Sequence, residues 1–251
     1  MFRRLFSSIA ACAAITLAAQ TQLEVPDFTA GSIAADTAEV EDADTYTRYT
    51  GNPAIDAFIN APQEVFPTID HMTRMDMADY FNSGSPKPSK NSLNGDCRID
   101  SASAAQVTLS TSDVSKTELS LLPMKSDTII MVINTLKTPV PDSSVKFYTY
   151  PQWQPISRGL FMVPGLDDWT AKEAKVERED LENAIPFMLA RFTYLPETRQ
   201  LILENNVGDY LPKEANKLVD GALKSRLVYR WDGSRMVKER AGEVRAGEAK
   251  Q

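Results

Sequence analysis

Four stretches in the middle of the chain alternate apolar and polar residues with a period of two, as strands with one buried face do. They are residues 106–111, 117–122, 128–136 and 144–150. The linkers between them are short, so neighbouring strands are expected to run antiparallel as a meander. Residues 93–99 are expected to add an edge strand. The uninterrupted apolar run at 129–133 predicts that 128–136 is a central strand, covered on both faces.

A helical pattern comes before these strands, within residues 52–84. Ile55, Phe58 and Ile59 share one face of a short helix. Thr73, followed three residues later by an acidic residue, resembles a capping box that opens a second helix. Gly84 is expected to end that helix. The Pro-containing residues after it predict a connector to the sheet.

The chain beyond residue 151 predicts a second set of elements. Residues 152–168 form a long excursion with two prolines and two glycines. The elements expected after it are a charged helix at 170–183, a hairpin of 187–194 and 200–204, a helix at 212–223, and a hairpin of 226–231 and 235–238 across Asp232-Gly233. We therefore expect an α+β fold, mainly antiparallel sheet with a few short helices. A helix and strand meander at 52–165 is followed by a smaller α+β unit at 166–239, packed on the first.

The first 19 residues have the features of a secretory signal peptide. Arg3 and Arg4 precede a run of small and apolar residues that continues to Ala19. This run is too short and too polar for a membrane-spanning helix. We expect an exported protein, periplasmic or extracellular, without an integral membrane span. A lipoprotein anchored through Cys12 is the less favoured alternative, because the apolar run continues well past that cysteine.

Residues 20–51 form an acidic leader that we expect to be flexible. Between residues 20 and 50, seven acidic residues accompany one basic residue, Arg48. The net charge is −7 for the whole chain and becomes −9 when two arginines are lost with the signal peptide. Nucleic acid and anionic lipid are therefore poor partners. Residues 240–251 have balanced charges and no apolar face, which predicts a disordered tail.

The scarcity of histidine and cysteine excludes several kinds of site. One histidine, His71, and one cysteine after residue 19, Cys97, exclude an internal disulfide and the usual His/Cys zinc sites. His71 does not converge with Asp76 and Asp79 on one helical face, so no metal site is expected. The chain has no Gly-rich phosphate loop, nucleophile elbow or paired Cys motif. No catalytic residue, metal or cofactor is predicted. Cys97 is expected to be a partly buried, unreactive thiol, and a crosslink between two copies is the alternative.

Three groups of residues remain as candidate binding positions. The first group lies on the helix before the strands. Capping and packing explain the other residues of this helix but not the members of this group. The second is an aromatic set around the last meander strand, whose imperfect alternation leaves some rings exposed unless a second layer covers them. The third is an acidic and aromatic pair that suits sugar stacking, or else begins a helix. The candidates are Asp79, Tyr80 and Asn82; Tyr148, Tyr150 and Trp153; and Asp168 and Trp169.

Several short motifs lie along the chain beyond the leader, together with Trp153 and the pair Asp168-Trp169. They are APQEVFP at 61–67, TRMDMADYFNSG at 73–84, ELSLLP at 118–123, DSSVKFY at 142–148, IPFMLARFTYLPET at 185–198 and LVYRWDG at 227–233. In these motifs the chain resembles an exported bacterial family known as domain of unknown function 3256. The resemblance implies export and an α+β fold, and it implies no activity or catalytic residue. It does not extend over the leader.

These observations favour a non-catalytic binding or structural module of the bacterial cell envelope over an enzyme. Its partner is expected to be a protein or a cell-surface component. The alternatives are a carboxylate-dependent glycan hydrolase, which uses Asp79 or the pair Asp167 and Asp168, and a proteinaceous inhibitor of a secreted enzyme. An exposed apolar patch favours the binding module, whereas a concave pocket that unites two carboxylates favours the hydrolase.

Overall fold

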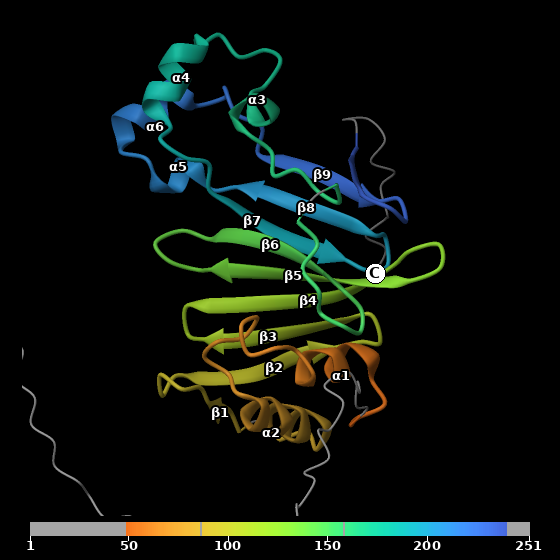
Figure 1. The fold of residues 1–251 in the computed structure, drawn as a ribbon. Coiled ribbons are helices and arrows are strands. Elements are labelled where there is room, and N and C mark those ends of the chain that lie inside the picture. The colour runs from red at the N-terminus through yellow and green to blue at the C-terminus, as the bar shows by residue number, and fades with distance from the viewer. Residues whose placement is uncertain (1–48, 86, 158, 240–251) are drawn as a thin grey trace, which may run out of the picture. The chain divides into compact units, whose positions relative to one another are not determined.

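The computed structural model describes residues 49–239, apart from residues 86 and 158, and these residues belong to one compact unit. The predicted signal peptide, the leader up to residue 48 and the predicted tail at 240–251 lie outside the described residues. Within the described part, two antiparallel sheets of six and four strands accompany six mostly short helices, which confirms the α+β class (Figure 1). No described helix is long and apolar enough to cross a bilayer. The domain boundary at residues 165 and 166 stays a prediction.

The six-stranded sheet is a meander in which each strand pairs with the next along the chain. Its strands are β1 (Ser89–Lys90), β2 (Asp96–Ala102), β3 (Gln106–Ser112), β4 (Ser115–Pro123), β5 (Thr128–Leu136) and β6 (Asp142–Thr149). Residues 129–133 of β5 are buried without interruption, as predicted for a strand covered on both faces. The prediction of an edge strand at 93–99 was wrong in position, because β2 pairs with both β1 and β3 and the edge belongs to β1.

Helices α1 (Pro53–Ile59) and α2 (His71–Asn82) cover one face of β1 to β4 and share a hydrophobic core with it. The predicted cap of α2 at Thr73 was wrong. Asp70 precedes the helix with extended backbone, and its Oδ1 accepts the N–H of Thr73 at 2.8 Å. Thr73 therefore lies inside the first turn. Gly84 ends the helix as predicted, with a φ of 69° that suits glycine.

The second sheet is formed by β7 (Ala190–Leu195), β8 (Gln200–Asn205), β9 (Arg226–Trp231) and β10 (Met236–Lys238), in the order β10-β9-β8-β7. Both predicted hairpins are confirmed. In the β9–β10 turn, Asp232 Oδ1 accepts the N–H groups of Ser234 and Arg235 at 2.7 and 2.8 Å. The side chain thus takes up two backbone donors that the turn leaves free.

Four short helices accompany this sheet: α3 (Leu166–Trp169), α4 (Arg178–Ala184), α5 (Val207–Tyr210) and α6 (Lys213–Val219). The prediction of one helix at 170–183 was wrong in extent. The Ala171 N–H donates to Ala222 O and Thr170 bridges to Leu223, so this backbone pairs with a distant segment instead of continuing a helix. The helix predicted at 212–223 ends at Val219, and Gly221 follows with a φ of 71°.

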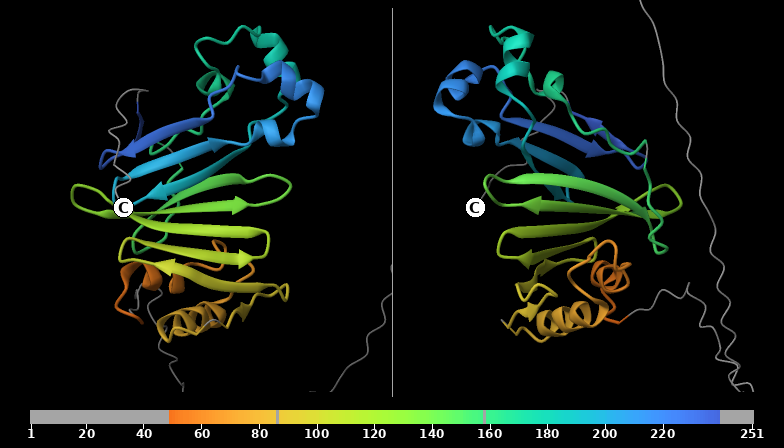
Figure 2. Two further views of the ribbon diagram at one scale, coloured as in Figure 1. Left: turned by 180° about the vertical axis from the view of Figure 1, so that it is seen from behind. Right: turned by 60° about the vertical axis from the view of Figure 1, so that its left-hand side comes forward.

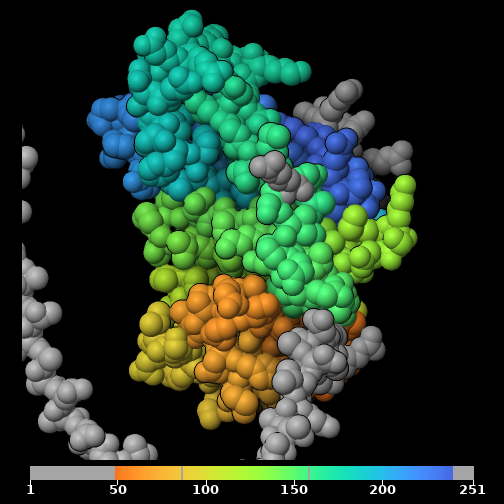
Figure 3. Space-filling model, in the orientation of Figure 1, coloured from red at the N-terminus to blue at the C-terminus, as the bar shows by residue number. Residues whose placement is uncertain are grey.

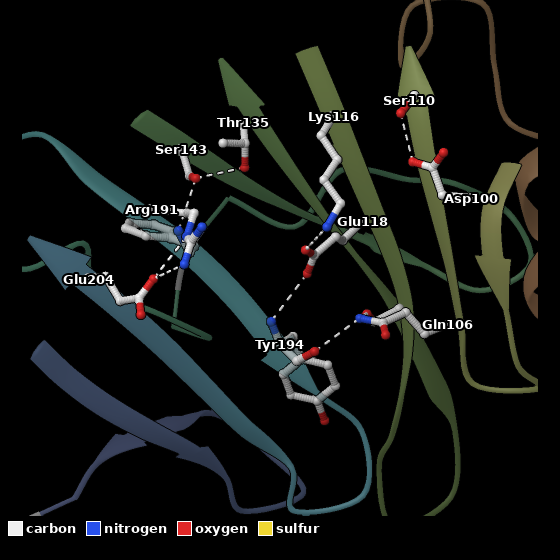
Figure 4. A network of polar contacts seen from close by, with 12 residues as sticks. Asp100, Gln106, Ser110, Lys116, Glu118, Thr135, Ser143, Arg191, Tyr194 and Glu204 are labelled. Atoms are coloured by element: carbon white, nitrogen blue, oxygen red, sulfur yellow. Dashed lines mark hydrogen bonds and ion pairs between the residues drawn. The ribbon is translucent and has the colours of Figure 1, made fainter. Parts of the chain in front are cut away.

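The edge of the second sheet stands on a face of the first, as Figure 4 shows from close by. The N–H groups of Ala190, Phe192 and Tyr194 in β7 point away from β8. They donate to Asp142 Oδ1 at 3.1 Å, to Ser143 Oγ at 2.9 Å and to Glu118 Oε2 at 3.3 Å, respectively. The Tyr194 carbonyl accepts from Gln106 Nε2 at 3.1 Å. Side chains from β6, β4 and β3 therefore satisfy the free edge of β7.

Apolar residues fill the space between the two sheets on one side of this polar row. They form a second hydrophobic core that includes Leu122, Met131, Phe192, Tyr229 and Trp231. The Trp231 Nε1–H donates to Pro123 O at 2.7 Å and so connects the two sheets again. Figure 2 shows the two sheets from two further sides.

Residues 150–157 and 159–165, here called the strap, lie between β6 and α3 and run along strand edges of both sheets. The Ile156 N–H donates to Phe147 O at 2.8 Å, and Pro155 bridges to Tyr148, so the strap covers the free edge of β6. Further on, Leu160 O accepts the N–H of Met236 in β10 at 2.7 Å. Figure 3 shows the strap, in green to teal, across the front of the molecule and against the blue residues of the second sheet.

Candidate functional site

The predicted aromatic set is mostly buried. Tyr148 and Trp153 expose only 9% and 5% of their surface, and their rings pack 5.2 Å apart between centroids in the core beneath α1 and α2. Tyr150 is half-buried against the same core. Helices α1 and α2 supply the covering layer, and Trp153, itself part of the strap, packs on Tyr148. The two buried rings form no exposed binding surface in this conformation.

The predicted polar group on α2 is divided between solvent and a cavity. Asp79 and Asn82 are exposed, while Tyr80 is half-buried and lines a cavity beside the end of the helix. The Nζ of Lys87 lies 5.3 Å from the centroid of the Tyr80 ring.

The predicted pair at α3, Asp168 and Trp169, is engaged in contacts with other residues of the fold. Trp169 is 1% exposed in the core between the sheets. Asp168 accepts from Lys238 Nζ at 2.7 Å and from the N–H of Gly165 at 3.2 Å, and these donors lower the pKa of its carboxyl, with the Lys238 hydrogen bond as the largest cause. Asp167 pairs with Arg178 at 2.7 Å. These contacts are those expected where a short helix begins and its first acidic residues form ion pairs.

The carboxylates of the hydrolase hypothesis are not brought together. Asp79, Asp167 and Asp168 do not line the cavities at the end of α2, along the strap or beside β2 and β3. Residues 49–239, without 86 and 158, also contain no group of three His, Cys, Asp or Glu side chains that could hold a metal ion. None of these cavities therefore brings the three acids together.

The described residue with the most exposed large apolar side chain is Met162 of the strap. Met162 is 85% exposed, its neighbour Val163 is 62% exposed, and Val237 of β10 is 41% exposed. Val163 lines a cavity of about 400 Å³, and Met162 and Val237 line another of about 640 Å³. Both cavities have Leu160 and Phe161 in their walls. We call this area the strap surface; it consists of Leu160, Phe161, Met162, Val163, Met236 and Val237.

Two contacts that hold the strap in place explain why Met162 and Val163 are exposed. Phe161 packs edge-on against Phe192 and Tyr229, at 6.2 and 5.1 Å between ring centroids. Leu160 is held by its backbone bond to Met236. Gly159, with a φ of 88°, permits the turn that precedes these contacts. Since Leu160 and Phe161 point into the core between the sheets, the next two side chains remain outside it.

The charged residues in the wall of the larger cavity are basic. Arg235 and Lys238 line it, and Lys238 is paired with Asp168. Lys224 lies close to this pair, since its Nζ donates to Asp168 O at 2.7 Å. Desolvation, followed by the nearby Lys238 charge, lowers the pKa of Lys224. The apolar strap surface thus has a basic border, and within the described part of the chain Lys238 is the cation of this border that forms an ion pair.

Sequence reasoning did not select Met162, Val163 or Val237. The segment FMVPG at 161–165 contains three large apolar residues in a stretch rich in proline and glycine. Such a run predicts either a buried loop or an exposed patch, and it has no period that separates the two. The contacts of Phe161 decide between them.

Comparison with known proteins places the chain in a family of unknown function. Its fold is similar to the structure of a domain of an uncharacterised protein from Porphyromonas gingivalis W83, with a TM-score of 0.63 and 22% sequence identity. The similarity covers 73% of this chain and 97% of the other and concerns the fold alone. No curated protein matches the chain. The family model described as "Protein of unknown function (DUF3256)" matches residues 49–236, and the chain belongs to this family.

Proposed function

We propose that the protein is a non-catalytic binding module that holds a segment of a partner protein on the strap surface. The observation that carries this proposal is the exposure of Met162, Val163 and Val237 around connected cavity walls. Larger contiguous apolar patches on protein surfaces mark sites of interaction with partners.

The border of the strap surface defines the chemistry of the partner segment. The Arg235 side chain is exposed and forms no ion pair among the described residues, although the Asp232 carboxylate accepts its backbone N–H; the Lys238 side chain is 37% exposed. A partner segment with an apolar side chain next to carboxylates is complementary to this arrangement. A basic segment would meet like charges and is disfavoured.

We further propose that the protein acts outside the cytoplasm, in the periplasm or outside the cell. The support is the sequence of the first 19 residues, with two arginines followed by small and apolar residues. The test is the intact mass of the protein recovered from cell fractions. A mass that begins at Gln20 in the exported fraction supports the proposal, and a chain that keeps Met1 in the cytoplasm contradicts it.

Site-specific photo-crosslinking tests the binding function. A photoreactive residue is placed at Met162 in cells that produce the protein, and the matched control carries it at Leu136, which is 60% exposed at the end of β5. We expect capture at position 162 alone, with captured peptides that combine an apolar residue with acidic neighbours. Arg235→Glu should reduce the capture. Equal capture at both positions, or captured peptides rich in Lys and Arg, would overturn the proposal.

A further inference from the structure

A second cavity lies at the C-terminal end of α2, away from the strap surface. The end of α2 forms a part of its wall that is fixed by backbone bonds: the Gly84 N–H donates to Phe81 O at 3.1 Å and the Ser85 N–H donates to Tyr80 O at 2.8 Å. This pair of bonds is a Schellman motif, with Gly84 in the left-handed conformation that the motif requires. Strands β1 and β2 provide the opposite wall through Ser89 and Ile99.

The cavity has the size and the mixed lining of a small-molecule site. Its volume is about 500 Å³, within the range of ligand pockets. Met77, Phe81 and Ile99 give it an apolar part. The buried Oγ of Ser89, in the same wall, has no hydrogen-bond partner in the described part of the chain. This oxygen is fully buried behind the wall, so the ligand contacts proposed below do not include it.

Two cations, Arg98 and Lys87, and one carboxylate, Asp100, line the cavity, and among the described residues only Arg98 is paired with a carboxylate. Arg98 is held through its Nε by Asp100 Oδ1 at 2.9 Å, and the other oxygen of Asp100 accepts from Ser110 Oγ at 2.7 Å. This pairing uses one donor of the guanidinium, so its two Nη groups remain for a planar anion. Lys87 stands over the Tyr80 ring, with no carboxylate in contact among the described residues.

We propose that this cavity binds a small organic carboxylate with an apolar body. Arg98 and Lys87 bind the carboxylate at the mouth, and Met77, Phe81 and Ile99 contact the apolar body. The Tyr80 ring lies beside the Lys87 ammonium and keeps that charge at the mouth. This site is independent of the strap surface and of the partner proposed for it.

Binding at this cavity is non-covalent. Cys97 also lies in the wall, but it is 0% exposed. Burial raises the pKa of the Cys97 thiol to about 11, so the thiolate that would attack a ligand is scarce at neutral pH. The cavity therefore serves recognition and not thiol chemistry.

Methyl-methionine NMR on the full-length protein tests the proposal. Met77 is 1% exposed and lies in the wall, so its methyl signal reports on occupancy. The probes are phenylacetate, its neutral isostere phenylacetamide, and the cation phenethylamine. We expect a saturable shift of the Met77 signal with phenylacetate. Phenylacetamide and phenethylamine should bind more weakly by at least about two- to fivefold, because a partly exposed ion pair contributes about that much affinity.

Variants at the mouth separate charge recognition from simple filling of a cavity. Arg98→Gln and Lys87→Gln should each weaken phenylacetate by about two- to fivefold, whereas Lys125→Gln, an exposed lysine in the β4–β5 turn, should leave it unchanged. Two results would overturn the proposal: no saturable shift of Met77 with phenylacetate, or equal affinity for phenylacetamide. Neither result affects the binding proposed at the strap surface, because Met162 reports on that surface separately.

Discussion

The carboxylate of Glu118 in β4 accepts the backbone N–H of Tyr194 in β7, at 3.3 Å between Oε2 and N and across 76 residues of sequence. The same carboxylate pairs with Lys116 at 3.1 Å through Oε1. Glu118 is 5% exposed, an unusual position for a glutamate. Its burial follows from the way the sheets meet, because an edge strand that stands on another sheet needs an acceptor for each inward N–H.

Replacement of Glu118 should show how much this acceptor contributes to stability. Glu118→Leu leaves the buried Tyr194 N–H without an acceptor, and we expect the free energy of unfolding to fall by about 1–3 kcal/mol. Glu118→Gln keeps an acceptor oxygen and loses the Lys116 ion pair, which should cost less than about 1 kcal/mol because Lys116 is partly exposed. Urea unfolding of both variants measures this. Glu197→Leu, at an exposed turn, is the control. Equal losses in the two Glu118 variants would show that the hydrogen bond is not the cause.

Arg74 is a second buried charged residue, and it acts as a cap. It is 3% exposed, and its Nη1 donates to Ala61 O and to Phe58 O at the end of α1. Desolvation lowers its pKa below the usual value. Arg74→Met removes these donors, and we expect a loss of about 1–3 kcal/mol in urea unfolding. Arg226→Met, on an exposed position of β9, should change stability by less than about 0.5 kcal/mol. A gain in stability on Arg74→Met would show that the desolvation of the charge outweighs its hydrogen bonds.

The cap of α2 gives a test with a pH dependence. Asp70→Ala should cost about 1 kcal/mol, because the N–H of Thr73 loses its acceptor. Thr73→Ala should cost less, since Thr73 is not the cap. Backbone and side-chain hydrogen bonds from Thr73 lower the pKa of Asp70 in the folded state. The contribution of Asp70 is thus present at neutral pH and is lost as the pH falls through that lowered pKa. Unfolding curves at neutral and acidic pH measure it, and a difference between wild type and Asp70→Ala that persists in strong acid would contradict this account.

Stability should fall at alkaline pH. Burial raises the pKa of Cys97 from about 9 to about 11, and it raises those of Tyr194 and Tyr229 from 10 to about 12. The folded state therefore holds these protons more tightly than the unfolded state. The stability from this difference is complete below pH 9 and declines as the pH rises through 11 and 12.

The variant Cys97→Ala isolates the thiol contribution. It is expected to be less stable at neutral pH, because it leaves a small cavity. Between pH 9 and 11, however, its stability should decline less steeply with pH, by up to about 1.4 kcal/mol per pH unit. Urea unfolding at a series of pH values gives the two slopes. Identical slopes would show that Cys97 does not titrate in this range.

The predictions from sequence were accurate where side chains alternate and failed where distant contacts decide. The strands β3 to β6 and both C-terminal hairpins follow from period-two patterns and turn residues. The residues at 170–177 have the composition of a helix, but Ala171 pairs with Ala222 instead. Local propensity does not include such a partner.

The candidate binding residues show the same limit. Some aromatic rings around Trp153 were expected to be exposed unless a second layer covered them, and Tyr148 and Trp153 are buried. The covering layer was not predictable from the local pattern, because helices α1 and α2, which cover these rings, lie far earlier in the sequence. Tyr80 lies in a cavity wall, and its role in binding stays a prediction. The contact of Glu118 with Tyr194 connects two strands of different sheets, and no local pattern indicates it.

The most direct measurement of the central claim is a methyl-methionine NMR titration of the strap surface. Met162 and Met236 line the larger cavity, and Met72, 67% exposed on α2, is an internal control. The probe is a short peptide in which leucines are flanked by glutamates, and the matched peptide carries lysines in place of the glutamates. The account predicts saturable shifts of Met162 and Met236 with the glutamate peptide, none at Met72, and weaker binding of the lysine peptide. Unchanged Met162 and Met236 signals, or equal binding of both peptides, would contradict it.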